Sequence, residues 1–120
     1  MQMENFENQI NKSDYKILIV DDIMSNVLLL KVLLTNEKYQ ICTASNGTEA
    51  IQQAIDELPD LILLDIMMPD MSGYEVAKVL KENERTMEIP IIFLTAQDDI
   101  QAEMKGFDLG ADDFIRKPFV

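Results

Sequence analysis

Five polar side chains stand at the ends of short apolar runs, and their types suit the handling of a phosphoryl group. They are Asp21, Asp22, Asp65, Thr95 and Lys117. Neighbouring carboxylates repel one another unless a cation is present, and Mg²⁺ prefers oxygen ligands and keeps several waters. A threonine hydroxyl can donate a hydrogen bond to a phosphate oxygen, and a lysine ammonium supplies a positive charge. Together these groups suit phosphoryl transfer, which depends mostly on positioning and charge neutralisation.

Each of these residues, taken alone, has an ordinary explanation. An aspartate at the end of a strand is usually a helix cap or a turn residue, a lone threonine there is unremarkable, and a lysine before a proline is usually a solvated surface charge. The combination is more specific, because the residues follow four of the predicted strands in a fixed order. Their joint occurrence therefore indicates one site.

The elements that must position these residues alternate along the chain. Strands are predicted at 16–20, 39–44, 60–65, 89–95 and 113–116, and helices at 25–35, 48–58, 74–84 and 98–109. Asp22 or Ser25 is expected to cap the first helix, and Asn46-Gly47 is expected to be a turn. This alternation predicts an α/β fold, a doubly wound parallel sheet with helices on both faces. Ligands bind beyond the carboxyl ends of such strands, where the polar residues are expected to converge.

The composition argues against several classes of function. The 120 residues include 22 acidic and 10 basic ones, a formal charge of −12, so nucleic acid and anionic membranes should repel the chain. It has no histidine, which removes histidine bases and the commonest zinc ligand. No apolar run approaches the roughly 20 residues needed to span a bilayer, and no secretory signal is recognisable. The single cysteine, Cys42, is expected to be a packed thiol, and a cytoplasmic domain is favoured.

Four motifs resemble, in order and spacing, those of the receiver domain of two-component response regulators. They are Asp21-Asp22, segment 63–73 (LLDIMMPDMSG), segment 93–96 (FLTA) and segment 110–119 (GADDFIRKPF). The resemblance covers residues 15–120 and implies a five-stranded, flavodoxin-like sheet with strand order 2-1-3-4-5. Residues 1–14 would be an N-terminal extension, in which Met3, Phe6 and Ile10 are spaced for one face of a short helix.

The resemblance gives each acidic residue a role. It implies that Asp65 accepts a phosphoryl group from a phosphohistidine on a sensor histidine kinase or a phosphotransfer protein. It implies that Asp22, Asp65 and the backbone carbonyl of Met67 bind Mg²⁺ directly, and that Asp21 acts mainly through water. The chain would then not be an enzyme acting on other substrates, since it would catalyse only its own phosphorylation and dephosphorylation.

The resemblance also implies how the other side of the site works. Thr95 and Lys117 would hold the phosphoryl oxygens, with help from the backbone amide of Ala96. Phosphorylation would draw Thr95 inward, and the aromatic ring of Phe114 would follow, which repacks a surface that partners read. Phe114 replaces the commoner tyrosine of the family, so only its packing position can signal.

The loop after Asp65 is expected to be shaped by Pro69 and Gly73. Gly73 is expected to adopt a backbone conformation that other residues resist. The side chains of Met67 and Met68 are expected to pack rather than to bind a ligand.

The end of the chain departs from the family pattern. Receiver domains continue with a fifth helix, whereas this chain stops at Val120, so we expect that helix to be missing and the domain to be truncated. Apolar surface beside the first helix would then be exposed. The N-terminal extension, through Phe6 and Ile10, or a second copy of the chain in a homodimer is expected to cover it.

Three other functions fit parts of the pattern less well. A phosphohydrolase of the haloacid dehalogenase type also uses aspartate, threonine, lysine and magnesium, but it needs two aspartates separated by one residue after a strand. A flavin-binding module would need a phosphate loop after the first strand, where this chain has carboxylates. A receiver that acts as an interaction module without phosphorylation would not need its complete acidic set.

Overall fold

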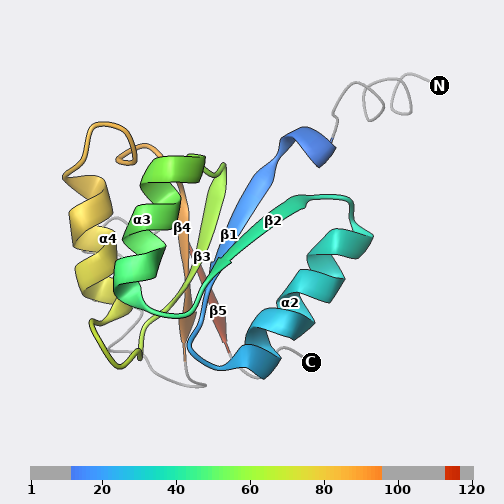
Figure 1. Ribbon diagram of the computed structural model, residues 1–120, viewed down its shortest axis with the longest axis horizontal. Coiled ribbons are helices and arrows are strands. Elements are labelled where there is room, and N and C mark those ends of the chain that lie inside the picture. Colours follow the sequence, from blue (N-terminus) through green and yellow to red (C-terminus); the bar gives the residue numbers. More distant parts are fainter. Residues whose placement is uncertain (1–11, 96–112, 117–120) are drawn as a thin grey trace.

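The sheet has the strand order that the resemblance to receiver domains implied. The computed structural model describes residues 12–95 and 113–116. Its elements are η1 (Lys12–Asp14), β1 (Lys16–Val20), α2 (Met24–Asn36), β2 (Gln40–Ala44), α3 (Gly47–Glu57), β3 (Leu61–Asp65), α4 (Gly73–Lys81), β4 (Ile91–Thr95) and β5 (Asp113–Arg116). The strands pair in parallel in the order β2-β1-β3-β4-β5, and Figure 1 shows them as the middle layer of the molecule.

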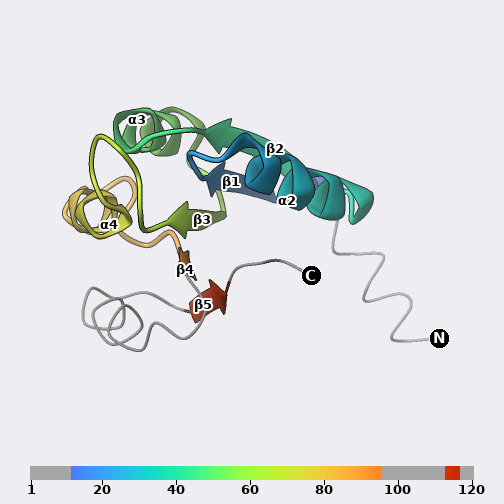
Figure 2. The same ribbon diagram turned by 90° about the horizontal axis from the view of Figure 1, so that it is seen from below.

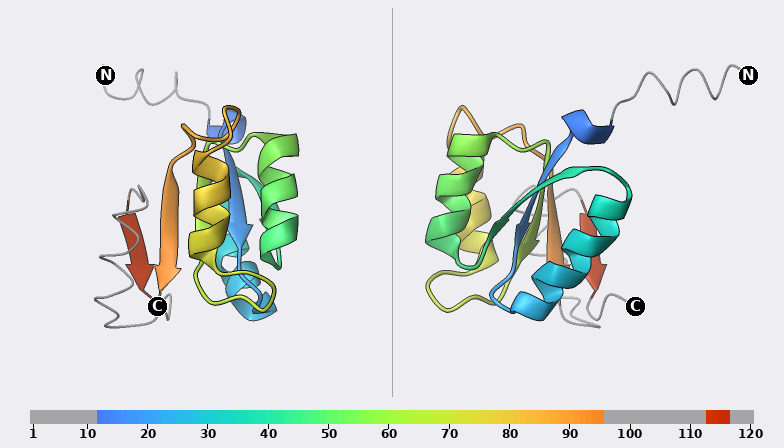
Figure 3. Two further views of the ribbon diagram at one scale, coloured as in Figure 1. Left: turned by 90° about the vertical axis from the view of Figure 1, so that its left-hand side faces the viewer. Right: turned by 45° about the vertical axis from the view of Figure 1, so that its right-hand side comes forward.

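Helices cover both faces of the sheet. Figure 2 shows α3 and α4 together on one face and α2 on the other, and the right-hand view of Figure 3 shows the strands between them. Side chains alternate along a strand, so the apolar run of β1 serves both faces. Leu18 and Val20 belong to the core under α3 and α4, whereas Ile17 and Ile19 belong to the core under α2. A continuous apolar run is therefore what this strand requires.

The helix α3 begins one residue earlier than predicted, because the Asn46-Gly47 turn is also its cap. The Asn46 side chain accepts a hydrogen bond of 2.8 Å from the Glu49 N–H, which satisfies one of the free amides of the first turn. Ala50 and Ala54 are fully buried, so small side chains let the helix axis approach the sheet closely.

The predicted cap of the helix α2 is wrong. Its N-cap residue is Ile23, which makes no side-chain capping bond. The carboxylate of Asp21 instead accepts a hydrogen bond of 3.0 Å from the Ile23 N–H. The prediction named Asp22, which precedes the N-cap, and Ser25, which lies inside the first turn of the helix, whereas the acceptor is Asp21, the residue that follows β1.

The helix α4 ends at Lys81, three residues before the predicted end. Beyond it, the buried hydroxyl of Thr86 donates a hydrogen bond of 2.6 Å to the Leu80 carbonyl. The Lys81 ammonium donates to the carbonyls of Met87 and Ile89. The Thr86 hydroxyl thus occupies the Leu80 carbonyl, which a helix continued to residue 84 would use for its own hydrogen bond. The chain turns toward β4 instead.

The outer side of α2 carries apolar side chains that the described residues leave exposed. Leu28, Leu29, Val32 and Leu33 are 39–57% exposed, whereas Val27 and Leu30 face the sheet and are buried. Phe6 and Ile10, expected to cover such a surface, lie outside the described residues, as does the predicted helix 98–109. The covering of this side of α2 therefore stays a prediction. Among the described residues, every helix is too short or too polar to span a bilayer.

Candidate functional site

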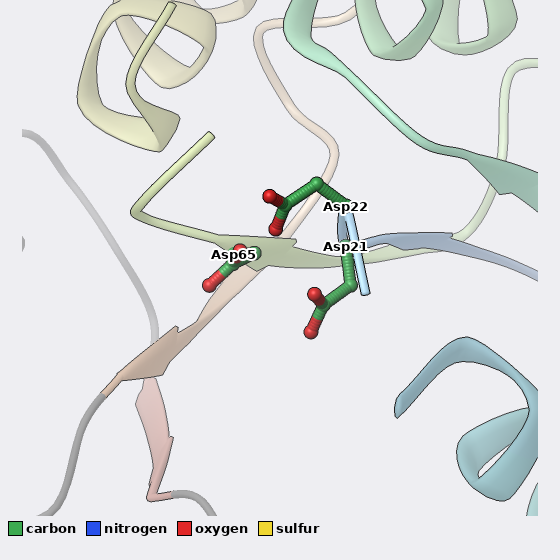
Figure 4. A group of neighbouring side chains, drawn as sticks. All are labelled: Asp21, Asp22 and Asp65. Atoms are coloured by element: carbon green, nitrogen blue, oxygen red, sulfur yellow. The ribbon is translucent and has the colours of Figure 1, made fainter. Parts of the chain in front are cut away.

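Three carboxylates meet at the carboxyl ends of β1 and β3. The two strands are neighbours with Val20 opposite Leu64, so the residues that follow, Asp21 and Asp65, stand side by side. One carboxylate oxygen from each of Asp21, Asp22 and Asp65 lies within 4.8 Å of the other two. Figure 4 shows the three side chains gathered where the strands end. The predicted convergence of these residues is confirmed.

The two adjacent aspartates of this cluster are held differently. Asp21 is 1% exposed, and its two oxygens accept hydrogen bonds from the Ile23 N–H at 3.0 Å and from the Asn26 side-chain amide at 3.1 Å. Asp22 is exposed, and within residues 12–95 and 113–116 we find no donor to its carboxylate. Asp21 is therefore fixed in place, whereas Asp22 can turn toward a ligand.

The donor set of the cluster fits a hard divalent cation. All three side chains offer carboxylate oxygens, which suit magnesium, calcium or manganese better than zinc or copper. Asp65 is 2% exposed and Asp22 reaches solvent, so a cation here would keep water on its open side. Magnesium commonly binds proteins through one or two carboxylates and several waters.

Thr95 reaches the same edge of the sheet. Leu94 of β4 pairs with Asp65 of β3, so Thr95 is the next residue beyond the acidic cluster on the neighbouring strand. It is 2% exposed. The backbone of Phe114 in β5 pairs with Phe93 of β4, and that of Arg116 pairs with Thr95. These pairings bring the ends of β4 and β5 to the edge where β1 and β3 end.

Two predicted phosphate-binding residues lie outside the described part of the chain. Ala96 and Lys117 directly follow β4 and β5 in the sequence. Their roles, like the switch role of Phe114, stay predictions.

The loop after Asp65 is closed by Gly73, for a reason that differs from the predicted one. The Gly73 N–H donates to the Ile66 carbonyl at 2.8 Å, and a Cβ atom at Gly73 would collide with the backbone carbonyl of Asp65. The residue does not adopt a left-handed conformation, so the expectation of an unusual backbone was wrong. Glycine is required because the helix α4 starts directly against the end of β3.

The packing prediction for the methionine pair is half right. Met68 packs against the core beneath α3 and α4, but the Met67 side chain is 79% exposed. Ile66, which is buried, fills the inward position instead. Nothing in these contacts concerns the Met67 carbonyl, so its role toward a metal stays a prediction.

Asp70, which the sequence did not single out, anchors this loop to the helix α3. Its carboxylate accepts hydrogen bonds from the N–H groups of Gly47 and Thr48 at 2.8 and 2.9 Å, and from the Thr48 hydroxyl at 2.9 Å. These donors, led by the Gly47 N–H, lower the pKa of Asp70 from 3.8 to about 2. The signal available in the sequence was an aspartate directly after Pro69, together with the Asn46-Gly47 pair earlier in the chain.

Cys42 behaves as the packed thiol that was expected. It is half-buried and free, its Sγ lies 3.9 Å from the Ile17 carbonyl, and burial raises the pKa of its thiol. A raised pKa keeps the thiol protonated and unreactive.

Comparison with protein families gives one match over most of the chain. Residues 17–120 match the family described as the response regulator receiver domain. The chain is 46% identical to the response regulator PleD of Caulobacter vibrioides over 103 residues, which are 86% of this chain and 23% of PleD. It is 46% identical to the alkaline phosphatase synthesis transcriptional regulatory protein PhoP of Bacillus subtilis over 104 residues, 87% of this chain and 42% of PhoP. The chain thus spans less than half the length of these relatives.

Solved structures show the same similarity over nearly their whole length. A putative response regulator from Chloroflexus aurantiacus superposes with a TM-score of 0.85 at 38% identity, covering 88% of this chain and 87% of that one. The chemotaxis protein CheY4 of Vibrio cholerae superposes with a TM-score of 0.83 at 31% identity, covering 88% of each chain.

Proposed function

Because the chain belongs to the family of response regulator receiver domains, whose members carry the phosphoacceptor of two-component signalling, we propose that Asp65 is the acceptor here. The observation that carries this proposal is the cluster of Asp21, Asp22 and Asp65 within 4.8 Å at the ends of β1 and β3. Asp65 is the only member of the cluster that a strand itself supplies, so the hydrogen-bonded sheet holds its backbone. A fixed backbone suits a nucleophile that must meet an incoming phosphorus atom.

The reaction at Asp65 would be a transfer between nitrogen and oxygen. Receiver domains are phosphorylated by histidine kinases, so the donor is a phosphohistidine on a kinase or a phosphotransfer protein. A carboxylate oxygen of Asp65 bonds to phosphorus, the phosphorus–nitrogen bond of the donor breaks, and the imidazole keeps the electron pair. The hydroxyl of Thr95 and the ammonium of Lys117 bind the phosphoryl oxygens, with the Ala96 amide beside them.

Magnesium is the cofactor that the cluster fits best. Asp22, Asp65 and the Met67 carbonyl would hold it directly, and Asp21 would act through water. When bound, it neutralises charge on the phosphoryl oxygens. The fixed Asp21 and the exposed Asp22 support this division, since a buried, doubly hydrogen-bonded carboxylate is less able to turn toward a cation than an exposed one.

Phosphorylation would then act as a conformational switch. The phosphoryl group on Asp65 would add negative charge beside Thr95. Thr95 would move in response, and the ring of Phe114 would move with it. The surface around β5 would pass the signal to an output partner. PhoP is by name a transcriptional regulatory protein, but the charge of −12 argues against DNA binding by this chain itself. A cytoplasmic signalling module, rather than an enzyme acting on other substrates, fits these features.

A phosphorylation assay tests the proposal. The protein is incubated with acetyl phosphate and Mg²⁺, and its intact mass is measured. We expect one added phosphate that is absent in Asp65→Asn and present in Asp56→Asn, which changes an exposed aspartate of α3. A phosphate that survives Asp65→Asn would refute the assignment of the acceptor. Steady release of phosphate over many cycles would instead favour a phosphohydrolase.

A further inference from the structure

Asn26, on the first turn of α2, contacts the acidic cluster directly. Its side-chain amide nitrogen donates a hydrogen bond of 3.1 Å to Oδ2 of Asp21. The other oxygen of that carboxylate, Oδ1, accepts from the Ile23 N–H at 3.0 Å. The carboxylate of Asp21 is thus held from two sides by α2, once by its backbone and once by a side chain.

The chemistry of the two groups fixes how Asn26 must face Asp21. An ionised carboxylate is an acceptor only, and an asparagine amide carries donors on its nitrogen and none on its oxygen. The nitrogen must therefore point at Asp21. Asp21 is 1% exposed, so solvent water has little access to replace this donor if Asn26 is removed. A buried acceptor that loses its donor is costly.

The contact also restricts rotation of the Asp21 carboxylate. The donor at Oδ2, added to the donor at Oδ1, restricts the turning of the group about its Cβ–Cγ bond and orients its plane. The neighbouring Asp22 has no such restraint among the described residues. Groups that orient the members of a metal site, without touching the metal, often set its affinity.

We infer that Asn26 is a positioning residue of the magnesium site, which fixes the plane of the Asp21 carboxylate so that its charge faces the cation held by Asp22 and Asp65. The inference rests on the proposed function, because it takes the acidic cluster to be a magnesium site. Asn26 acts through Asp21 and touches neither the metal nor the phosphoryl group.

The test measures Mg²⁺ binding by isothermal titration calorimetry, without phosphorylation. Asn26→Leu keeps a similar volume and removes the donor, and we expect the dissociation constant to rise about tenfold or more. The matched control is Asn36→Leu at the exposed end of the same helix, about 15 Å along the axis, where the dissociation constant should not change. Circular dichroism checks that each variant is folded, and Asn26→Ala provides a second variant without the branched side chain.

A double-mutant cycle with Asp21→Asn shows whether Asn26 acts through Asp21. Once Asp21 has lost its charge, removing Asn26 should change the dissociation constant no further. A purely structural role would lower the unfolding temperature of the metal-free protein but leave the dissociation constant unchanged, and this outcome would overturn the inference. An additive effect in the cycle would overturn it as well.

The failure of the inference can be told apart from that of the proposed function. If the wild-type protein binds no Mg²⁺ and gains no phosphate, the proposed function fails. If the wild-type protein binds Mg²⁺ and Asn26→Leu binds it equally well, only the role of Asn26 fails.

Discussion

Two helices of this domain begin against an aspartate that lies outside the helix. At α2 the aspartate is Asp21, which follows β1 and is 1% exposed. At α3 it is Asp70, from the loop after β3, which is exposed and accepts from Gly47 and Thr48. The chemistry is the same, a carboxylate at a positively polarised helix start. The comparison teaches that the neighbours of a carboxylate, rather than its hydrogen bonds to a helix start, separate the two roles, because Asp21 lies beside Asp22 and Asp65 whereas Asp70 anchors a loop.

The largest expected effect comes from removing the charge at each aspartate in turn. Asp21→Asn should raise the Mg²⁺ dissociation constant about 10–100-fold, because a buried charge beside the cation is lost. Asp70→Asn makes the same chemical change at an exposed position, where solvent and salt screen the charge, and it should leave the dissociation constant unchanged. Calorimetric titrations of both variants check this. An equal rise of the dissociation constant in both variants would contradict the different roles of Asp21 and Asp70.

The close packing at the start of α3 gives the next largest effect. A Cβ atom at Gly47 would collide with the Met71 side chain, so Gly47→Ala should push away the loop that carries Asp70. We expect a loss of about 1–3 kcal/mol in the free energy of unfolding, as for other overpacked sites. Urea denaturation measures it, and Met71→Ala in the same chain should relieve most of the loss. Without this relief, the collision with Met71 would not be the cause.

A smaller effect is expected at the local cap of α3. Asn46→Ala removes the acceptor for the Glu49 N–H and should cost about 1 kcal/mol of unfolding free energy. Asn46→Asp retains an acceptor and should cost much less, so the pair separates the hydrogen bond from other effects. If both variants lose the same free energy of unfolding, the hydrogen bond from the Glu49 N–H does not cause the loss. Mg²⁺ affinity should change in neither, because Asp70 still holds the loop.

The smallest expected effect is a dependence of the free energy of unfolding on pH. The Gly47 N–H and its neighbours lower the pKa of Asp70 from 3.8 to about 2. A carboxylate whose pKa is lowered by folding stabilises the folded state above pH 3.8 and loses that contribution as the pH falls through about 2. The stability difference between wild type and Asp70→Asn should therefore be constant near neutral pH and shrink toward zero at about pH 2. A difference that does not change with pH would contradict this pKa.

Most of the fold could be predicted from the sequence, because its signals are local. The run 16–20 is apolar at every position of β1 except its first, as a strand covered on both faces must be, and β1 and β5 have the predicted bounds. The predicted bounds were wrong where the end of a helix depends on contacts with residues outside that helix. At the end of α4, the Thr86 hydroxyl donates to the Leu80 carbonyl within the helix, and the Lys81 ammonium donates to the Met87 carbonyl beyond it, and no periodicity of the sequence predicts such contacts.

The acidic cluster could be predicted as well, but the division of roles within it could not. Asp21 and Asp22 are identical in type and adjacent in sequence, yet only Asp21 is buried and doubly hydrogen-bonded. Asn26 and Asp70 were missed because an asparagine in a helix and an aspartate in a loop are common in any protein. Their importance follows only from what lies opposite them.

By itself, the sequence determined the alternation of strands and helices and which polar residues end the strands, and the resemblance to receiver domains supplied the order of the strands in the sheet. Only the tertiary structure decided which carboxylate is buried, which helix start each aspartate meets, and why residue 73 must be glycine. The physical reason is that hydrogen bonds and close contacts join residues far apart in the chain. Asp70 and Gly47 are 23 positions apart, and only folding of the sheet brings them together.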